Sequence, residues 1–174
     1  RCEKNIDIYR FKHSLNSILP FDISVVSMEK VDEDFHARFG AKKRSYVYLI
    51  TQFKSPYFLN YAYYYHDKIN VERLNYFSRN LFGEHNFTSF SKKISDTENK
   101  VCTIHSAHWK ETRGVIVFYI EADRFLHGMV RTIVGTVLKA VKISAGNNYI
   151  SDLIDARNRE EAGEAVPAKG LFLF

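Results

Sequence analysis

Apolar residues recur along the chain at two spacings, which predict an alternating order of helices and strands. Apolar residues three and four positions apart predict helices, and runs of β-branched and aromatic residues predict strands. The predicted helices span residues 10–19, 71–82, 125–141 and 149–162. The predicted strands span residues 23–31, 43–51, 101–110 and 115–122, followed by an extended end that begins just past Pro167.

Local signals mark the boundaries of several of these elements. Pro20 ends the first helix, because the residue before a proline avoids the helical conformation. Asn70 is placed to cap the second helix. The tetrad Glu-Thr-Arg-Gly at 111–114 is turn-like, so the strands on either side of it are predicted to form a β-hairpin. This order predicts an α+β fold, an antiparallel β-sheet with helices packed on one face. We expect residues 1–174 to form one compact domain.

Composition is typical of a folded domain and favours an anionic partner. The 174 residues are 45% hydrophobic and 15% aromatic, which is enough apolar material to bury a core. Lys and Arg number 25 against 20 for Asp and Glu, so nucleic acid is the first class of partner to consider. Cys2 and Cys102 lack any paired spacing, so the sequence indicates neither a disulfide framework nor a cysteine zinc site. A reducing cytoplasm fits this usage best.

Several other classes of protein and site are not indicated. Arg131, Lys139 and Lys142 interrupt the longest apolar run, so no membrane span is predicted. His105 and His108 fall on opposite faces of a predicted strand, which argues against a metal site there. The sequence has neither a glycine-rich phosphate loop nor the nucleophile elbow of a hydrolase. The sequence therefore indicates neither a metal site nor a hydrolase or a nucleoside triphosphatase.

The strand predicted at 43–51 carries a face that grades from cationic to aromatic. Strand alternation places Lys42, Arg44, Tyr46 and Tyr48 on that face. Such a face is expected where phosphates are held beside a base that stacks on a ring. A buried tyrosine pair that ends in a solvated basic turn explains the same residues.

The helix predicted at 125–141 is almost wholly apolar, with Arg131 near its middle. Gly128 and Gly135 are its neighbours at helical spacing, and small residues there allow another backbone or a ligand to come close. An unpaired buried guanidinium is costly, so Arg131 needs an anion unless it snorkels to solvent along the helix. Asp123 is expected to act at the start of the helix, where a carboxylate complements the helix dipole.

Five linked stretches resemble the tRNA pseudouridine synthase A family and cover nearly the whole chain. They are LNSILPFDI, DFHARFGAKKRSYVY, GEHNFTSFSKK, RFLHGMVRTIVGTVL and AKGLFLF, in the family's order. The resemblance implies a cytoplasmic, homodimeric enzyme that isomerises uridine to pseudouridine in the anticodon stem-loop of tRNA without metal or organic cofactor. The family's nucleophile is an aspartate in an Arg-Thr-Asp-Ala-Gly-Val-His-type motif.

That aspartate motif is absent from the sequence, so we expect it to precede Arg1 and the 174 residues alone to be inactive. An alternative is an RNA-binding module that descends from an enzyme and has lost the catalytic aspartate. The genomic sequence upstream of Arg1 distinguishes the two hypotheses.

Three site residues carry over from the family by their positions in these stretches. Tyr46 matches the tyrosine that stacks on the target uracil and has been assigned a role in proton transfer. Arg131 matches the arginine that pairs with the nucleophilic aspartate, and Leu171 matches the apolar residue beside the base. Asn86 is a departure, since the family often has Asp there. The residues expected to contact RNA phosphates are Arg38, Lys42, Lys43 and Arg44.

Overall fold

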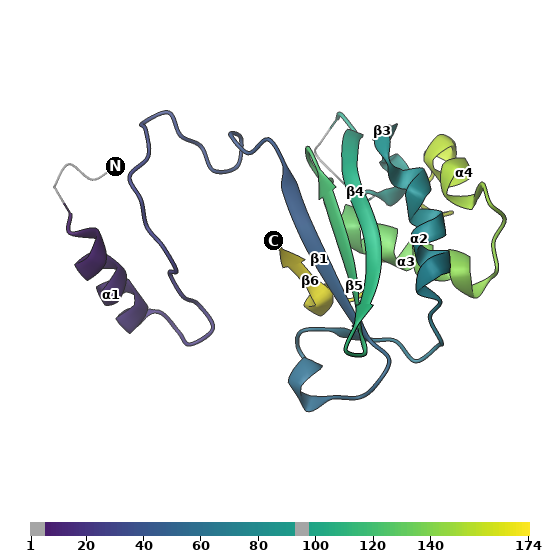
Figure 1. Cartoon of the computed structure of the whole chain (residues 1–174). Helices are drawn as coiled ribbons and strands as arrows, with labels where there is room; N and C mark the ends of the chain where they lie inside the picture. Colours follow the sequence, from purple (N-terminus) through teal and green to yellow (C-terminus); the bar gives the residue numbers. More distant parts are fainter. Residues whose placement is uncertain (1–5, 93–97) are drawn as a thin grey trace. The chain divides into compact units, whose positions relative to one another are not determined.

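The structure is a computed structural model that describes residues 6–92 and 98–174 (Figure 1). Residues 1–5 and 93–97 lie outside this description. The chain divides into two compact units, residues 1–40 and residues 41–174. The expectation of one compact domain over the whole chain stays a prediction.

The described part of the first unit, residues 6–40, contains one helix, α1 (Ile8–Ile18), as the apolar spacing predicted. The Asp7 side chain caps it by accepting a hydrogen bond from the Arg10 amide, at 3.1 Å. The strand predicted at 23–31 is wrong, because no strand of the described residues pairs with this segment. The Asn16 side chain from α1 instead bonds both backbone groups of Val25, at 2.7 and 3.0 Å.

The second unit is built on a six-stranded sheet in the order β2-β1-β5-β4-β3, with β6 also paired to β1. The strands are β1 (Arg44–Thr51), β2 (Tyr63–Tyr64), β3 (Gly83–Asn86), β4 (Val101–Thr112), β5 (Val115–Ala122) and β6 (Leu171–Leu173). All pairs are antiparallel except the short parallel pair of β1 with β2. The predicted α+β fold is confirmed. The sheet is mixed rather than purely antiparallel, because β2 pairs in parallel with β1.

The predicted hairpin is confirmed as β4 and β5, with a tighter turn than the tetrad suggested. Arg113 and Gly114 have φ angles of 51° and 76° and are the two residues between the strands. Positive φ at both turn positions matches the right-handed twist of the flanking strands. β4 therefore extends two residues further than predicted, through Thr112, and β5 has the predicted bounds.

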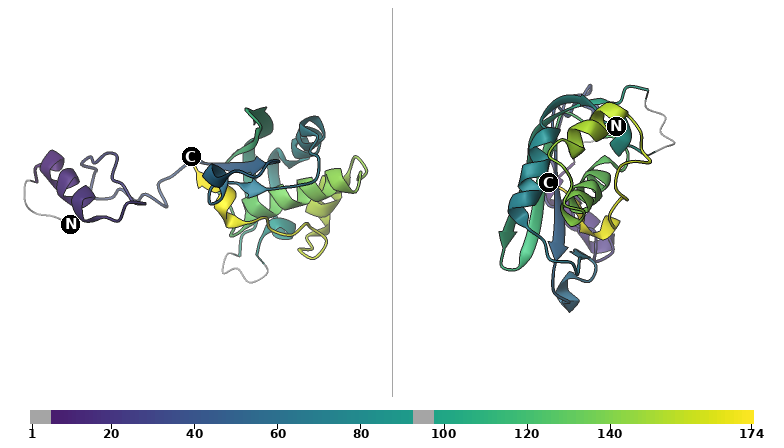
Figure 2. Two further views of the ribbon diagram at one scale, coloured as in Figure 1. Left: turned by 90° about the horizontal axis from the view of Figure 1, so that it is seen from below. Right: turned by 90° about the vertical axis from the view of Figure 1, so that its right-hand side faces the viewer.

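Three helices cover one face of the sheet, and all lie on the same side of it in Figures 1 and 2. They are α2 (Val71–Ser78), α3 (Met129–Lys142) and α4 (Tyr149–Ala156). The helix predicted from 125 begins only at 129, because Gly128 has φ 75°. The helix predicted to 162 ends at 156, where Arg157 takes φ 49°. None of the helices in the described residues is long and apolar enough to cross a membrane.

Alternation along the strands sorts the core from the open face. On β5, Ile116, Phe118 and Ile120 are buried, and the residues between them are half-exposed. On α3, nine of the fourteen residues are buried, which matches its nearly continuous apolar sequence. Burial of this apolar surface supplies most of the stabilisation of the second unit.

Candidate active site

A backbone segment lies directly on α3 where the helix presents its small residues. This segment is residues 163–167, hereafter the strap. A Cβ atom built on Gly135 would lie 1.8 Å from the carbonyl oxygen of Glu164, so only glycine allows this approach. The Gly163 amide donates to Oγ1 of Thr136, at 2.9 Å. The small-residue stripe of the helix therefore accommodates another backbone, one of the two occupants that the sequence left open.

Arg131 is tied to the strap by two hydrogen bonds with Val166. Its Nε donates to the Val166 carbonyl at 2.6 Å, and the Val166 amide donates to the Arg131 carbonyl at 3.2 Å. The side chain is half-buried, and among residues 6–92 and 98–174 no carboxylate forms an ion pair with it. A guanidinium anchored through Nε still has four N–H donors on its two terminal nitrogens. This end of the side chain has the shape that binds a carboxylate in a bidentate manner.

Tyr46 and Leu171 lie on the face of the sheet that carries the helices. In the pairing of β1 with β6, Leu171 is opposite Tyr48, and Leu173 is opposite Tyr46. Directly opposed residues share a face, and diagonal neighbours such as Tyr46 and Leu171 are within reach of each other's side chains. The Tyr46 ring is half-buried and packs edge-on against Phe125, with the centroids 5.2 Å apart.

Tyr48, two residues further along β1, is fully buried and connects this face to the strap. Its hydroxyl donates to the Pro167 carbonyl at 2.6 Å, while Arg131 bonds the preceding carbonyl, that of Val166. Burial raises the pKa of Tyr48, and the charge of Arg131 opposes part of that rise. The phenol is therefore protonated and acts as a donor. The strap thus contacts Arg131 on α3 and Tyr48 on β1.

Two of the four residues predicted to contact phosphates, Arg38 and Lys42, are exposed and precede β1. Arg38, in the first unit, places its guanidinium 5.6 Å from the centroid of the Phe39 ring. Lys42, in the second unit, lies two residues before β1 and is exposed. Both remain predictions as phosphate ligands.

The other two basic residues, and Asp123, make contacts within the second unit. Lys43 pairs with Glu121 at 3.1 Å, which lowers the pKa of that carboxyl, and Arg44 donates to the Asp123 carbonyl at 3.0 Å. The Asp123 carboxylate accepts from the Thr103 amide at 2.8 Å. The expectation that Asp123 acts at the start of α3 is wrong, because its carboxylate is used to hold β4. Any phosphate contact of Lys43 would compete with its ion pair.

Comparison with known proteins gives the family. A family model described as tRNA pseudouridine synthase matches residues 78–174. The tRNA pseudouridine synthase A of Bacteroides fragilis is 39% identical over 97% of this chain and 67% of its own length. That of Bacillus subtilis is 36% identical over 98% and 70%, and tRNA pseudouridine synthase A 2 of Clostridium perfringens is 37% identical over 99% and 72%. The chain belongs to the tRNA pseudouridine synthase A family.

One departure from the usual tRNA pseudouridine synthase A pattern has a simple structural reading. Asn86, where the family often has Asp, accepts hydrogen bonds through Oδ1 from the amide and the hydroxyl of Thr88. These bonds hold the start of a short 3₁₀ turn at Thr88–Phe90. A carboxylate oxygen accepts the same two bonds, so Asn and Asp are interchangeable for this role.

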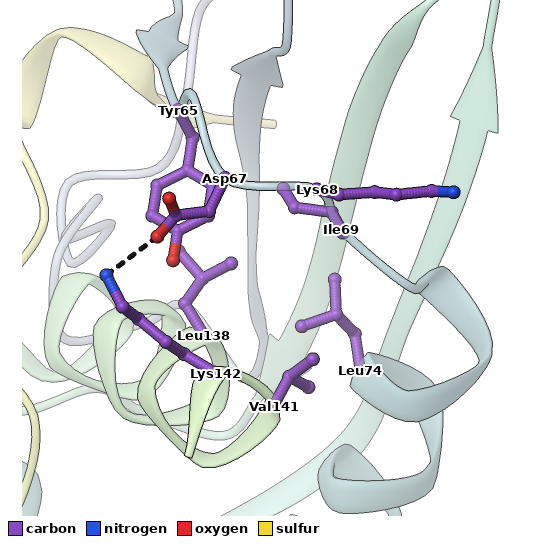
Figure 3. A pocket seen from close by; sticks show the side chains of 8 residues that line it. All are labelled: Tyr65, Asp67, Lys68, Ile69, Leu74, Leu138, Val141 and Lys142. Carbon is purple, nitrogen blue, oxygen red and sulfur yellow. Dashed lines mark hydrogen bonds and ion pairs between the residues drawn. The ribbon is translucent and has the colours of Figure 1, made fainter. Parts of the chain in front are cut away.

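A separate pocket of about 280 Å³ lies at the C-terminal end of α3 (Figure 3) and contains none of the predicted site residues. Lys142 pairs there with Asp67 at 2.7 Å, and this contact holds the pKa of Asp67 below its usual value. A cation on the last turn of a helix complements its dipole. The pair thus ties the segment that follows β2 to the end of α3.

Sequence reasoning missed two residues that contact the strap or belong to it, Val166 and Tyr48. Val166 acts through its backbone, which carries no sequence signal, and it is 35 positions from Arg131. Tyr48 was read only as one residue of an aromatic face. Gly170 was a possible signal, since a glycine immediately before an apolar strand often marks a close approach of another group, and an added Cβ atom there would be 2.8 Å from Cζ of Tyr48.

Proposed function

We propose that the protein containing this chain is a tRNA pseudouridine synthase that isomerises uridine to pseudouridine in the anticodon stem-loop. Relatives that are 36–39% identical carry the name tRNA pseudouridine synthase A. The observation that carries the proposal is the guanidinium of Arg131, anchored through Nε to the Val166 carbonyl, in a chain whose Tyr46 and Leu171 share one face of the sheet. No observation favours the alternative of a catalytically dead RNA-binding module.

The reaction needs a nucleophile that this chain does not provide. None of its aspartates lies in an Arg-Thr-Asp-Ala-Gly-Val-His-type motif, and the chain spans 67–72% of the three relatives described above. We propose that a segment preceding Arg1 supplies the aspartate. The nucleophile attacks the target nucleoside, the bond from the ribose to N1 of uracil breaks, and the freed base turns. Carbon 5 then bonds to the ribose and the bond to the aspartate breaks. Carbon 5 loses its proton, and N1 takes one up.

Three residues of this chain have roles in this reaction. Arg131 binds the aspartate end-on, which favours its ionised form and fixes its orientation. Tyr46 stacks on the uracil once the base has been flipped out of the RNA stack and takes part in proton transfer. Leu171 packs against the same base. Holding the base between a ring and an apolar side chain lets it turn without leaving the site.

We further propose that Arg38, Lys42, Lys43 and Arg44 contact phosphates of the tRNA. Such contacts fix where the RNA lies and do not select the base. On the strength of the family resemblance, we also propose that the enzyme works in the cytoplasm as a homodimer without metal or organic cofactor.

The direct test uses an unmodified tRNA transcript and the full-length natural protein. After incubation, the RNA is digested to nucleosides, and pseudouridine is measured by chromatography and mass spectrometry. We expect pseudouridine to form in the anticodon stem-loop. A transcript with cytidine in place of the uridines of that stem-loop is the matched control and should remain unmodified. If the unaltered transcript also remains free of pseudouridine, the proposed function is refuted.

A further inference from the structure

Tyr48 contacts the last residue of the strap, Pro167, and the residue just before β6, Gly170. Its hydroxyl donates to the Pro167 carbonyl at 2.6 Å. Its ring lies against Gly170, where an added Cβ atom would be 2.8 Å from Cζ of Tyr48. The side chain has no exposed surface. Tyr48 is thus in no position to contact a substrate, but it touches the backbone that precedes Leu171.

The Pro167 carbonyl and the carbonyl that orients Arg131 belong to consecutive residues. Val166 accepts from Arg131 Nε at 2.6 Å, and the peptide that joins Val166 to Pro167 is planar. Only the two backbone torsions of Pro167 separate the carbonyls, and the ring of proline fixes one of them. A bond that holds the Pro167 carbonyl therefore also restricts the Val166 carbonyl.

We propose that Tyr48 is a positioning residue for the reaction, acting through the strap on Arg131 and through Gly170 on Leu171. The hydroxyl fixes the Pro167 carbonyl and with it the acceptor of Arg131 Nε. The ring fixes the backbone just before Leu171. The catalytic consequence rests on the proposed function, whereas the effect on Arg131 rests on geometry alone.

The substitution Tyr48→Phe isolates the hydroxyl, because phenylalanine fills the same space in the core. It leaves the Pro167 carbonyl without its donor and gives the strap more freedom. Ser89→Ala is the matched control. The Ser89 hydroxyl is also buried and also donates to a backbone carbonyl, that of Leu153 on α4. Each variant removes one hydroxyl from one buried carbonyl, but only Tyr48→Phe affects the strap.

The first measurement is solvent exchange of the Arg131 Nε–H by NMR in the ¹⁵N-labelled 174-residue protein. The signal is assigned by its disappearance in Arg131→Lys. We expect exchange to become about 3- to 10-fold faster in Tyr48→Phe, the range that the net free energy of one hydrogen bond allows, and to be unchanged in Ser89→Ala. Equal exchange in the two variants would overturn the proposal.

The second measurement is the kinetics of pseudouridine formation by the full-length protein. We expect Tyr48→Phe to lower kcat about 3- to 10-fold with KM unchanged, since the surface that binds tRNA is intact. A fall in kcat no larger than that of Ser89→Ala would overturn the catalytic part. If the unsubstituted protein makes no pseudouridine, the proposed function fails, and the exchange measurement still decides whether Tyr48 positions Arg131.

Discussion

At the scale of single residues, the side chain of Arg131 has two ends with separate tasks. Nε bonds the Val166 carbonyl within the chain, and the terminal nitrogens are left for the carboxylate that we propose. The sequence was enough to single out this residue, because a lone guanidinium in an apolar helix calls for an anion. It was not enough to find Val166, because a backbone carbonyl is the same at every position.

Arg131→Lys should abolish most of the activity while leaving the fold intact. A lysine ammonium is a single point that cannot bond the Val166 carbonyl and also bind a carboxylate in a bidentate manner. We expect kcat for pseudouridine formation by the full-length protein to fall about 100-fold or more. The control is Arg157→Lys, which makes the same exchange at an exposed position after α4 and should leave kcat unchanged. Activity of Arg131→Lys within a few-fold of the unsubstituted protein would contradict the role of Arg131.

At the scale of elements, the long patterned segments were predictable and the short or partnered ones were not. The apolar spacing of α2 and the β-branched and aromatic runs of β1 and β5 identified these elements correctly. β2 has two residues and β3 has four, which is too short for a pattern. Residues 23–31 have the composition of a strand, but a strand also requires a partner.

One edge of the sheet shows why local patterns do not determine all contacts. Asn75, on α2, donates to the Trp109 carbonyl at 2.9 Å and accepts from the Trp109 amide at 2.8 Å. Beyond β3, this side chain thus takes the place of a neighbouring strand for β4. Nothing in the helical spacing of α2 indicates that task, since a polar residue on a helix usually faces solvent.

Gly135→Ala should destabilise the second unit by displacing the strap. The added Cβ atom would lie 1.8 Å from the Glu164 carbonyl oxygen, so the two backbones must separate. We expect the free energy of unfolding to fall by about 3 kcal/mol, measured by urea denaturation. Gly146→Ala is the control, because an added Cβ atom there has no neighbour within 4 Å, and it should change stability by less than about 1 kcal/mol. Equal losses in the two variants would mean that the strap does not depend on Gly135.

At the scale of the whole molecule, the net charge of +5 favours an anionic partner, and we propose that the basic residues between positions 38 and 44 contact phosphates of the tRNA. Binding that neutralises phosphates releases counterions, so its affinity depends steeply on salt. The sequence predicted this class of partner from charge alone. It could not rank the four basic residues, because the pairing of Lys43 with Glu121 is visible only in the folded sheet.

The affinity of the full-length protein for tRNA should fall steeply as salt is raised. Four phosphate contacts predict a loss of roughly 50-fold between about 50 and 200 mM salt, measured by filter binding. Lys42→Ala should weaken binding and make the affinity for tRNA less dependent on salt, by the contribution of about one phosphate contact. Lys110→Ala, on β4 and also exposed, is the matched change of charge and should leave the dependence unaltered. A flat salt response of the unsubstituted protein would argue against phosphate contacts by these residues.

The central claim is that this chain holds the Tyr46, Arg131 and Leu171 part of a pseudouridine synthase site, while its nucleophile lies upstream. Release of tritium from tRNA labelled at carbon 5 of uridine tests it most directly, because that proton is lost when carbon 5 bonds to the ribose. We predict release by the full-length protein and none by residues 1–174 alone. Turnover by the 174 residues alone, or no release by the full-length protein, would contradict the account.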